Sequence, residues 1–461
     1  MHTKHPFLGR SHELSLLQKR YEREEGQLAL VYGRRRIGKS FLLERFAHGK
    51  PVIFHQASLQ TEETELAGFT DLIRSATGSE HLPEGYRFPT WETALVFLAA
   101  RHAHSRLLVI LDEFPYLVET TPALPSLIQR WWDQVGKTSG IMLVLCGSAQ
   151  AFMESLDAQA APLHQRFTAK LHIGPLGYRD AALFMPNLSA EEKARVYGIL
   201  GGTPFYLRQW DQRRSLRENI LELFADPASS LVDSAELVLS TDLQDARAPY
   251  RALQAVALGA SKHSEIRDKA KLSNERILAR LLTLGFLEKR TPATEHPERT
   301  KRGVYVISDN YFRFYFRFIA MNRGQIARGL GKKVIDGTIL PLLDDFMGAA
   351  FESMACEFVR FLMGRGALPG DDVGSWWSTD GQHEIDLVGT RNQKEPTFIG
   401  SVKWRSAPLG DSVLADLERD APVLGVAPNL PRILIGRGGL AAKLMGRSGI
   451  LGYSIEDLYA E

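Results

Sequence analysis

The sequence has few of the features that mark secreted, membrane-spanning or disulfide-rich proteins. Its 461 residues include two cysteines, Cys146 and Cys356, which stand far apart and outside any metal-ligand spacing. No apolar run is long enough to cross a bilayer. The opening residues 1–6 lack the apolar core of a signal peptide. We therefore expect a protein of the reducing cytoplasm that has no membrane partner.

A large net charge is also absent. Lys and Arg number 56 against 54 Asp and Glu, which gives a formal net charge of +2. This balance excludes a globally basic nucleic-acid binder but leaves room for a local basic patch. A hydrophobic content of 44% and a charged content of 24% are typical of a soluble globular protein. The length predicts two to four domains.

The clearest functional motif is a glycine-rich segment at residues 33–40. Its sequence is Gly33-Arg34-Arg35-Arg36-Ile37-Gly38-Lys39-Ser40, which matches the phosphate-binding loop pattern G-x-x-x-x-G-K-[ST]. The apolar run 28–32 predicts a strand before it, and the residues from Phe41 predict a helix after it. This order directs backbone N–H groups and a helix N-terminus at a polyphosphate. We expect Lys39 to contact the phosphates of ATP and Ser40 to ligate Mg²⁺.

Two adjacent carboxylates follow a second strand candidate. The apolar run 107–111 is dense enough for a central parallel strand and is followed at once by Asp112 and Glu113. Ligands of open α/β sheets bind at the carboxyl ends of the strands. We expect Asp112 to hold the Mg²⁺ shell and Glu113 to orient or deprotonate the attacking water. The simpler alternative is a strand that ends in an acidic turn.

A third strand candidate, 141–146, would lie beside the Asp112 strand. It ends in Gly147-Ser148-Ala149-Gln150, which would bring Ser148 or Gln150 near the γ-phosphate. Turn chemistry alone also explains this Gly-Ser pair. Arg166 is a candidate for stabilising charge on the transferring phosphoryl group, and a solvated surface arginine is the alternative.

These motifs, in this order, resemble the predicted archaeal-type ATPases of the STAND/AAA+ P-loop group. The resemblance is carried by Phe7-Leu8-Gly9-Arg10, the three arginines of the loop, Leu111-Asp112-Glu113-Phe114, Cys146-Gly147-Ser148 and Gly201-Gly202-Thr203-Pro204. It implies that Phe7 and Arg10 lie on the adenine side and that Pro204 belongs to a helical lid that touches the nucleotide. It places Arg34, Arg35 and Arg36 in phosphate contact or in surface packing. It also implies a C-terminal DUF234-like domain.

The middle of the chain, from Ala248, resembles a winged helix. Three short helices are expected, the last beginning after Ser273, and two strands at 285–290 and 303–307 enclose a polar loop. As a DNA reader, this module would present Asn274, Arg276 and Arg280 to a groove, with phosphates on Lys289, Arg290, Arg299, Lys301 and Arg302. As a structural module, it would relay nucleotide state between its neighbours. Both interpretations remain open at this point.

The run Tyr311-Phe312-Arg313-Phe314-Tyr315-Phe316-Arg317-Phe318 is unusually aromatic. It could stack on bases, but no RNA-binding motif surrounds it. A buried helix that joins the domains is the better interpretation.

The C-terminal part resembles the PD-(D/E)xK nuclease fold. Glu384 and Asp386 share one face of a predicted strand, Ser401 and Lys403 share a face of the next, and Glu352 lies on a preceding helix. The resemblance implies that Asp386 and Glu352 bind a divalent metal and that Lys403 activates water or stabilises the phosphate. Ser401 stands where a Glu is usual, and a serine supplies no negative ligand. Either Glu384 substitutes or the chemistry is lost; an ordinary amphipathic hairpin is the alternative.

We therefore expect an α/β protein of four parts. They are a P-loop AAA+/STAND-like core (1–175), a helical lid (176–245), a winged-helix domain with its connecting helix (246–330) and a restriction-endonuclease-like α/β domain (331–461). The expected function is an ATP-hydrolysing switch, with ATP and Mg²⁺ as ligands, whose C-terminal half binds nucleic acid, DNA being favoured, and cleaves it where the nuclease chemistry is kept. The alternatives are a STAND-type signalling scaffold that assembles into a homo-oligomer with nucleotide, and a DNA-binding regulator with an inactive nuclease-like domain.

Overall fold

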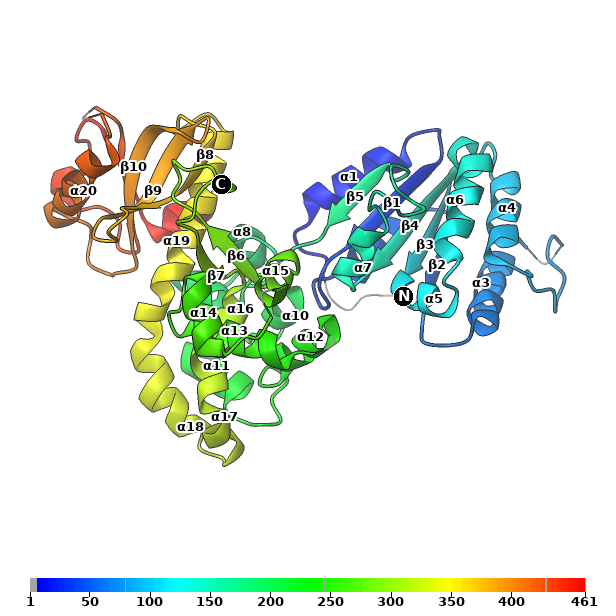
Figure 1. Cartoon of the computed structure of the whole chain (residues 1–461), viewed down its shortest axis with the longest axis horizontal. Coiled ribbons are helices and arrows are strands. Elements are labelled where there is room, and N and C mark those ends of the chain that lie inside the picture. The colour runs from blue at the N-terminus through cyan, green and yellow to red at the C-terminus, as the bar shows by residue number, and fades with distance from the viewer. Residues whose placement is uncertain (1–5, 79, 244, 275, 428, 461) are drawn as a thin grey trace. The chain divides into compact units, whose positions relative to one another are not determined.

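The computed structural model describes residues 6–78, 80–243, 245–274, 276–427 and 429–460. The chain divides into two compact units, Met1–Pro175 and Leu176–Glu461 (Figure 1). We describe each unit by itself. Within the second unit, the further domain boundaries expected from the sequence stay predictions.

The first unit is built on a five-stranded parallel sheet in the order β2-β3-β4-β1-β5. Every position of β3 and β4 is buried, which explains why their sequences are continuous apolar runs. The expected pairing of the strand 141–146 with the Asp112 strand is confirmed. The strands are β1 (Gln27–Tyr32), β2 (Val52–Gln56), β3 (Leu107–Asp112), β4 (Ile141–Gly147) and β5 (Ala169–His172).

Helices cover both faces of this sheet, and each face has its own apolar cluster. On one face Leu28 and Leu30 of β1 join Trp91 and Trp131, and on the other Ala29 and Val31 join residues of α1 and α2. Two buried faces define the doubly covered α/β architecture that the sequence predicts. The helices are α1 (Ser11–Tyr21), α2 (Lys39–Ala47), α3 (Glu62–Thr77), α4 (Trp91–Arg101), α5 (Phe114–Thr120), α6 (Leu124–Gln134), the short η1 (Gly136–Thr138) and α7 (Gln150–Ser155).

The second unit begins with helices and a two-stranded ribbon. Five helices come first: α8 (Tyr178–Ala182), α9 (Ala190–Leu200), α10 (Pro204–Leu207), α11 (Leu216–Phe224) and α12 (Ser234–Asp242). Three more precede the antiparallel ribbon: α13 (Arg247–Ala257), α14 (His263–Ala270), α15 (Arg276–Thr283), β6 (Leu287–Arg290) and β7 (Val304–Ile307). The order of three helices and a ribbon is the order expected from the sequence.

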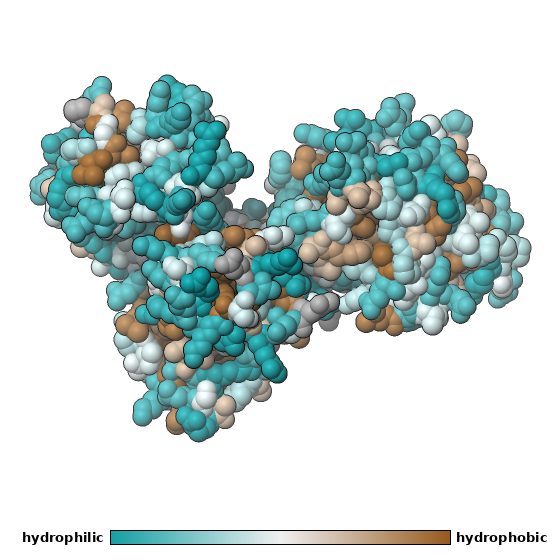
Figure 2. Space-filling model, in the orientation of Figure 1, coloured by the Kyte–Doolittle hydropathy of each residue, from teal (hydrophilic) through white to brown (hydrophobic). Residues whose placement is uncertain are grey.

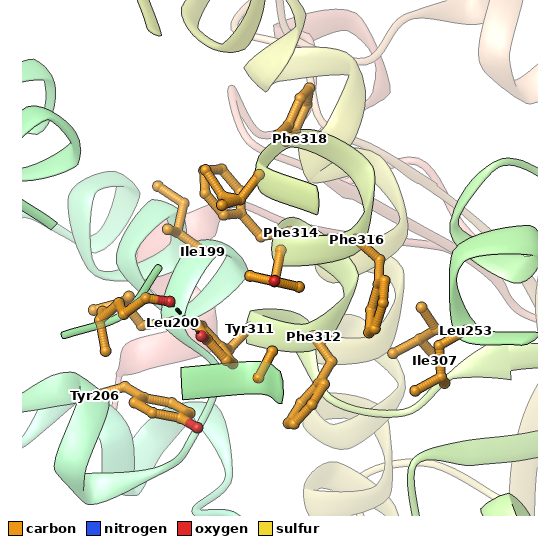
Figure 3. Packing of buried hydrophobic residues seen from close by; sticks show 14 of the residues in the cluster. Ile199, Leu200, Tyr206, Leu253, Ile307, Tyr311, Phe312, Phe314, Phe316 and Phe318 are labelled. Atoms are coloured by element: carbon orange, nitrogen blue, oxygen red, sulfur yellow. Dashed lines mark hydrogen bonds between the residues drawn. The ribbon is translucent and has the colours of Figure 1, made fainter. Parts of the chain in front are cut away.

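The aromatic run at 311–318 forms the buried helix of this unit. It spans α16 (Asn310–Phe314) and the π-helical turn η2 (Tyr315–Ile319), and all six of its aromatic residues are at most 2% exposed. In Figure 3, Phe312 and Phe316 lie on the side of Leu253 and Ile307, while Tyr311 lies on the side of Leu200 and Tyr206. The expectation of a buried helix is confirmed, because both of its sides pack in one core.

A mixed sheet in the order β12-β11-β10-β9-β8 closes the chain. Strands β8 to β10 are antiparallel, whereas β10, β11 and β12 are parallel. The long helix α19 packs on one face through Phe351 and Met354, and α20 packs on the other through Val413 and Leu417. The elements are α17 (Ala320–Ala327), α18 (Gly331–Val334), η3 (Ile335–Ile339), α19 (Leu340–Gly364), β8 (Asp372–Trp377), β9 (Glu384–Arg391), β10 (Glu395–Lys403), α20 (Asp411–Leu424), β11 (Arg432–Gly436), η4 (Ala442–Leu444), β12 (Ile450–Tyr453) and α21 (Ile455–Tyr459).

The surface seen in Figure 2 is mostly hydrophilic, with apolar residues in small separate patches. Among the described residues, no helix combines the length and the hydropathy needed to cross a membrane.

Candidate functional site

The loop between β1 and α2 has a backbone that only glycine fits at two positions. Gly38 has a φ of +93° and caps α2 in the left-handed region. A Cβ at Gly33 would lie 2.2 Å from the carbonyl oxygen of Ile173 on the adjoining segment. The motif glycines therefore shape the loop that the sequence predicts, at the N-terminus of α2.

Lys39 is folded back over this loop. It is buried, and its Nζ donates hydrogen bonds to the carbonyl oxygens of Gly33 at 2.9 Å and Arg34 at 3.1 Å. Two neutral carbonyl oxygens of its own loop therefore hold the ammonium over the loop. From this position Lys39 Nζ can donate hydrogen bonds to the oxygens of a phosphate.

Ser40 and Asp112 meet at the carboxyl end of the sheet. The Ser40 hydroxyl donates to Asp112 Oδ2 at 2.6 Å, and Asp112 Oδ1 accepts the N–H of Glu113 at 3.0 Å. The Asp112 side chain is fully buried. A hydroxyl and a carboxylate side by side beside a phosphate cradle are hard oxygen donors, so this pair fits Mg²⁺. The structure thus brings together the two residues expected to hold the ion.

Glu113 and Ser148 are also brought together. Glu113 has a φ of +53° at the start of α5, and its Oε2 accepts the Ser148 hydroxyl at 3.1 Å. Gln150, the other candidate at this strand end, instead contacts His172 with 2.9 Å between Nε2 atoms. Ser148 is therefore the residue placed to hold the Glu113 carboxylate.

The segment before α1 is tied to the phosphate loop. Arg10 is buried, and its guanidinium donates to the carbonyl oxygens of Gly174 at 2.5 Å and Ile37 at 3.3 Å. The Phe7 and Phe41 rings lie 5.6 Å apart between centroids. The sequence did not predict the bonds to Ile37 and Gly174, because these partners are 27 and 164 residues away from Arg10 along the chain and no local pattern indicates such contacts.

The three loop arginines have different environments. Arg34 is buried, Arg35 is exposed, and Arg36 is half-buried with a φ of +67°. The three arginines therefore need not have the same role. Their contacts with nucleotide stay predictions.

Two further predicted residues lie outside this cluster of contacts. Arg166 is held by Asp133 of α6 through bonds of 3.0 and 2.8 Å, which raise the pKa of its guanidinium and lower the pKa of the Asp133 carboxyl. Pro204 begins α10 in the second unit. Their roles toward nucleotide stay predictions.

In the second unit, Asp386 is the centre of a polar cluster. Strands β9 and β10 form the expected antiparallel hairpin. Asp386 Oδ2 accepts the Ser401 hydroxyl at 2.9 Å, the Val402 N–H at 2.7 Å and Lys403 Nζ at 2.9 Å. The side chains of Ser401 and Lys403 therefore meet Asp386 as the shared strand face predicts.

Two more carboxylates lie close to Asp386. Burial, together with the charges of Asp386 and Glu384, raises the pKa of Glu352 to about 7, against the charges of Lys403 and Arg290. Burial and Asp386 also raise the pKa of Glu384. Glu352 and Asp386 line one polar cavity of about 420 Å³.

This cluster does not form a ready metal cage. In the described ranges, no three or more His, Cys, Asp or Glu side chains are arranged to share one metal ion. Glu352 and Asp386 together offer two carboxylates, and the substitution of Glu384 for the missing Glu stays a prediction.

The loop between β6 and β7, residues 291–303, packs on the C-terminal sheet. The Ala293 N–H donates to Ser375 of β8 at 2.9 Å, and Arg302 bonds to Glu295 and to the Trp377 carbonyl. Arg290 donates to Ser353 of α19 at 3.1 Å. As a DNA reader, one of the two open interpretations, the module would place these two arginines on phosphates. Both have bonds within the unit, and their contact with phosphates stays a prediction.

The other residues of this module that the sequence offered for contact with nucleic acid lie at the surface. Asn274, Arg276 and Arg280 are exposed on and before α15, and so are three basic residues of the ribbon and its loop: Lys289, Arg299 and Lys301. Their contact with nucleic acid stays a prediction.

Comparison with known proteins finds a different protein family in each of two segments of the chain. Residues 7–210 match a family described as an ATPase domain predominantly from Archaea. The chain carries an archaeal-type ATPase domain. Residues 315–413 match the DUF234 family, described as archaeal and bacterial proteins of unknown function.

Relatives extend over most of the chain. An uncharacterized protein of Methanocaldococcus jannaschii is 28% identical over 91% of this chain and 93% of its own length. Among solved structures, a Walker-type ATPase of Pyrococcus abyssi aligns with 68% of this chain and 96% of its own, at 18% identity and a TM-score of 0.48. The ORC2 protein of Aeropyrum pernix, solved with ADPNP and ADP, aligns with 70% of this chain and 96% of its own, at 15% identity and a TM-score of 0.41.

Proposed function

We propose that this ATPase is a nucleotide-controlled switch whose C-terminal half binds nucleic acid. The observation that carries the ATPase part is the contact of Ser40 with Asp112 at 2.6 Å, with Glu113 adjacent and Lys39 over the loop. Phosphoryl transfer needs such positioning and charge more than covalent chemistry.

Each residue of the ATP site has its own role in hydrolysis. Lys39 exchanges its carbonyl partners for phosphate oxygens. Ser40 and Asp112 would hold Mg²⁺, which would supply positive charge beside the phosphates. Glu113 accepts the proton of the attacking water as the general base. Ser148 holds Glu113 by the hydroxyl bond until nucleotide is in place. Arg166 would add positive charge only after leaving Asp133.

Nucleic-acid binding is supported by the exposed face of α15. Arg276 and Arg280 stand one turn apart on the helix that follows two others and precedes a ribbon, as in a winged helix. With Lys289, Arg299 and Lys301 exposed nearby in sequence, this face offers cations to phosphates in a protein of low net charge.

Cleavage of the bound nucleic-acid strand would be an additional activity of the C-terminal half. Lys403, Asp386 and Glu352 are the groups that would meet a phosphodiester, in the manner of the PD-(D/E)xK fold. Ser401 binds Asp386 where a second carboxylate would be expected, which favours binding over cleavage.

Labelled DNA and RNA tested with Mg²⁺ or Mn²⁺, with and without ATP, separate these functions. Cleavage that is lost in Asp386→Ala and Lys403→Ala, but kept in Glu395→Ala at the far end of β10, supports a nuclease. Salt-sensitive binding without cleavage, weakened by Arg276→Ala and Arg280→Ala but not by Arg328→Ala on the exposed end of α17, supports a DNA-binding regulator. The absence of both binding and cleavage would contradict the nucleic-acid part of the proposal. The absence of ATP hydrolysis would contradict the ATPase part.

A signalling scaffold is the second candidate. The packing of the 291–303 loop on β8 favours it, because Ala293 and Arg302 of that loop are bonded within the protein. A change of mass in solution on adding ATP, together with no affinity for nucleic acid, would support the scaffold. Light scattering with ATP and with ADP measures this directly.

A further inference from the structure

A second cavity of about 420 Å³ lies in the unit Leu176–Glu461, apart from the one lined by Glu352 and Asp386. Its walls come from the end of α13, from β7, from η2 and from α19. Apolar side chains form most of the lining, among them Val256, Ile307, Phe318 and Phe346. Such a cavity suits the apolar body of a small molecule.

Two arginines of the aromatic run also line this cavity, Arg313 and Arg317. The aromatic residues of the run are absorbed by the core, as Figure 3 shows, so the arginines are the part of the motif that packing does not explain. Arg317 is exposed and lies in η2, a π-helical turn. Such turns inside α-helices occur frequently at functional sites.

The Arg313 guanidinium is incompletely satisfied. Its Nη2 donates to the Ile307 carbonyl at 3.2 Å, whereas its Nη1 is buried and has no hydrogen-bond partner in the part of the chain that is described. Burial, together with the charge of Arg290, lowers the pKa of Arg313 to about 10, against the charges of Glu288, Glu352 and Asp309. A buried cationic N–H without an acceptor carries a free-energy cost that an anion in the cavity would remove.

We propose that this cavity binds a small molecule in which one anionic group, a carboxylate, phosphate or sulfonate, is joined to an apolar body. Nη1 is closed to solvent in this structure, so the anionic group accepts from it once the Arg313 guanidinium turns into the cavity. Arg317 lies at the mouth, and the body lies against Phe318 and Phe346. Asp345 also lines the mouth and offsets one of the two arginines, and the carboxylates of Glu288, Glu352 and Asp309 also act on Arg313. One anionic group on the ligand is therefore the expected charge, and a larger anion must reach solvent.

Because the walls come from α13 and β7 on one side and from α19 on the other, a bound molecule contacts both groups of elements. Binding to the folded state alone stabilises that state by mass action. The ligand thus holds the α13–β7 module on the helix that leads to the C-terminal sheet.

The test uses two fluorescent probes of nearly the same shape. 1-Anilinonaphthalene-8-sulfonate carries the anionic group, and N-phenyl-1-naphthylamine lacks it. Each is titrated into the full chain at saturating ATP, which keeps the P-loop site occupied. We expect saturable binding of the anionic probe at one site per chain, at least tenfold weaker in Arg313→Met, with less than a twofold change for the neutral probe.

A second variant keeps the test decisive if Arg313→Met fails to fold. Ala349→Leu enlarges an exposed wall residue of α19 without touching any charge, and it should weaken both probes at least fivefold. Circular dichroism and thermal unfolding establish the fold of each variant. The proposal is overturned if the native chain binds no probe at one site, if folded Arg313→Met keeps its affinity for the anionic probe, or if Ala349→Leu binds both probes unchanged.

Discussion

Asp112 connects three parts of the ATP site through its two carboxylate oxygens. One oxygen takes the Ser40 hydroxyl and the other takes the Glu113 N–H, so a single buried residue fixes the phosphate loop against the end of β3. The residues of this site are local in sequence or stand at strand ends, which is why the motif 33–40 and the pair Asp112-Glu113 could be identified without a structure. The sequence placed Ser148 or Gln150 near the γ-phosphate, because both follow the same strand, and it did not predict the bond of Ser148 to Glu113.

Lys39→Ala should remove ATP binding. The variant loses the one ammonium held over the loop, and charge-assisted bonds of this kind contribute about 1.5–3 kcal/mol each, so we expect the affinity to fall by at least about 30-fold. Titration with a fluorescent ATP analogue measures it. Lys137→Ala, an exposed lysine after α6, is the matched control. Retained ATP affinity in Lys39→Ala would contradict the site.

Glu113→Gln should separate binding from chemistry. The amide still accepts the Ser148 hydroxyl but takes no proton from water, so kcat should fall by about 100-fold or more while the Kd for ATP stays within about threefold. Phosphate release and ATP titration give the two numbers. Glu119→Gln, exposed near the end of α5, should leave both unchanged. An equal loss of binding and turnover would show that Glu113 is structural.

Glu352→Gln should stabilise the protein at high pH. The folded-state pKa of Glu352 is raised from 4.5 to about 7, so its favourable contribution is complete below about pH 4.5 and is lost as the pH rises through about 7. The variant has no proton to lose. In EDTA its Tm should exceed the native Tm by a few degrees at pH 8, for a free-energy gain of about 3 kcal/mol at most, and should match it near pH 4.5.

Scanning calorimetry at several pH values tests this, with Glu395→Gln on the exposed end of β10 as the control. A difference in Tm that does not change with pH would show that Glu352 is not the group that titrates.

At the scale of elements, strands differ in how plainly the sequence marks them. The runs 107–111 and 141–146 predict β3 and β4 because strands buried on both faces have no polar position. Strands β2 and β5 are short and partly exposed, and neither stands out from its surroundings. The hairpin of β9 and β10 follows from side chains two apart sharing a face.

The packing of the 291–303 loop could not be predicted. It depends on contacts over 75 residues, such as that of Arg302 with the Trp377 carbonyl, and no local pattern encodes them. In the sequence, Arg290 and Arg302 are cations of a polar ribbon. Only the fold shows that Arg290 bonds to Ser353 and Arg302 to Glu295.

Arg302→Met should release this loop from β8. The variant loses the bonds to Glu295 and the Trp377 carbonyl, so the Ala293 N–H that donates to Ser375 should exchange with solvent at least about tenfold faster. Hydrogen exchange followed by mass spectrometry measures it. Lys301→Met, one residue away and exposed, is the control. Unchanged exchange in Arg302→Met would show that other contacts hold the loop.

At the scale of the whole molecule, the chain joins an ATPase domain to a second unit of different design. The parallel sheet of the first unit and the mixed sheet of the second are separate structures, each with helices on both faces. The α/β class of both could be predicted from the sequence, since apolar runs and alternation reveal them.

The most direct test of a nucleotide-controlled switch is the affinity of one protein for DNA in its two nucleotide states. Glu113→Gln is titrated into fluorescein-labelled double-stranded DNA with Mg²⁺-ATP and, separately, with ADP, and anisotropy is read at several salt concentrations. We predict salt-sensitive binding whose Kd differs at least fivefold between the two nucleotides, and no such difference in Lys39→Ala. The same Kd with ATP and with ADP would contradict the account.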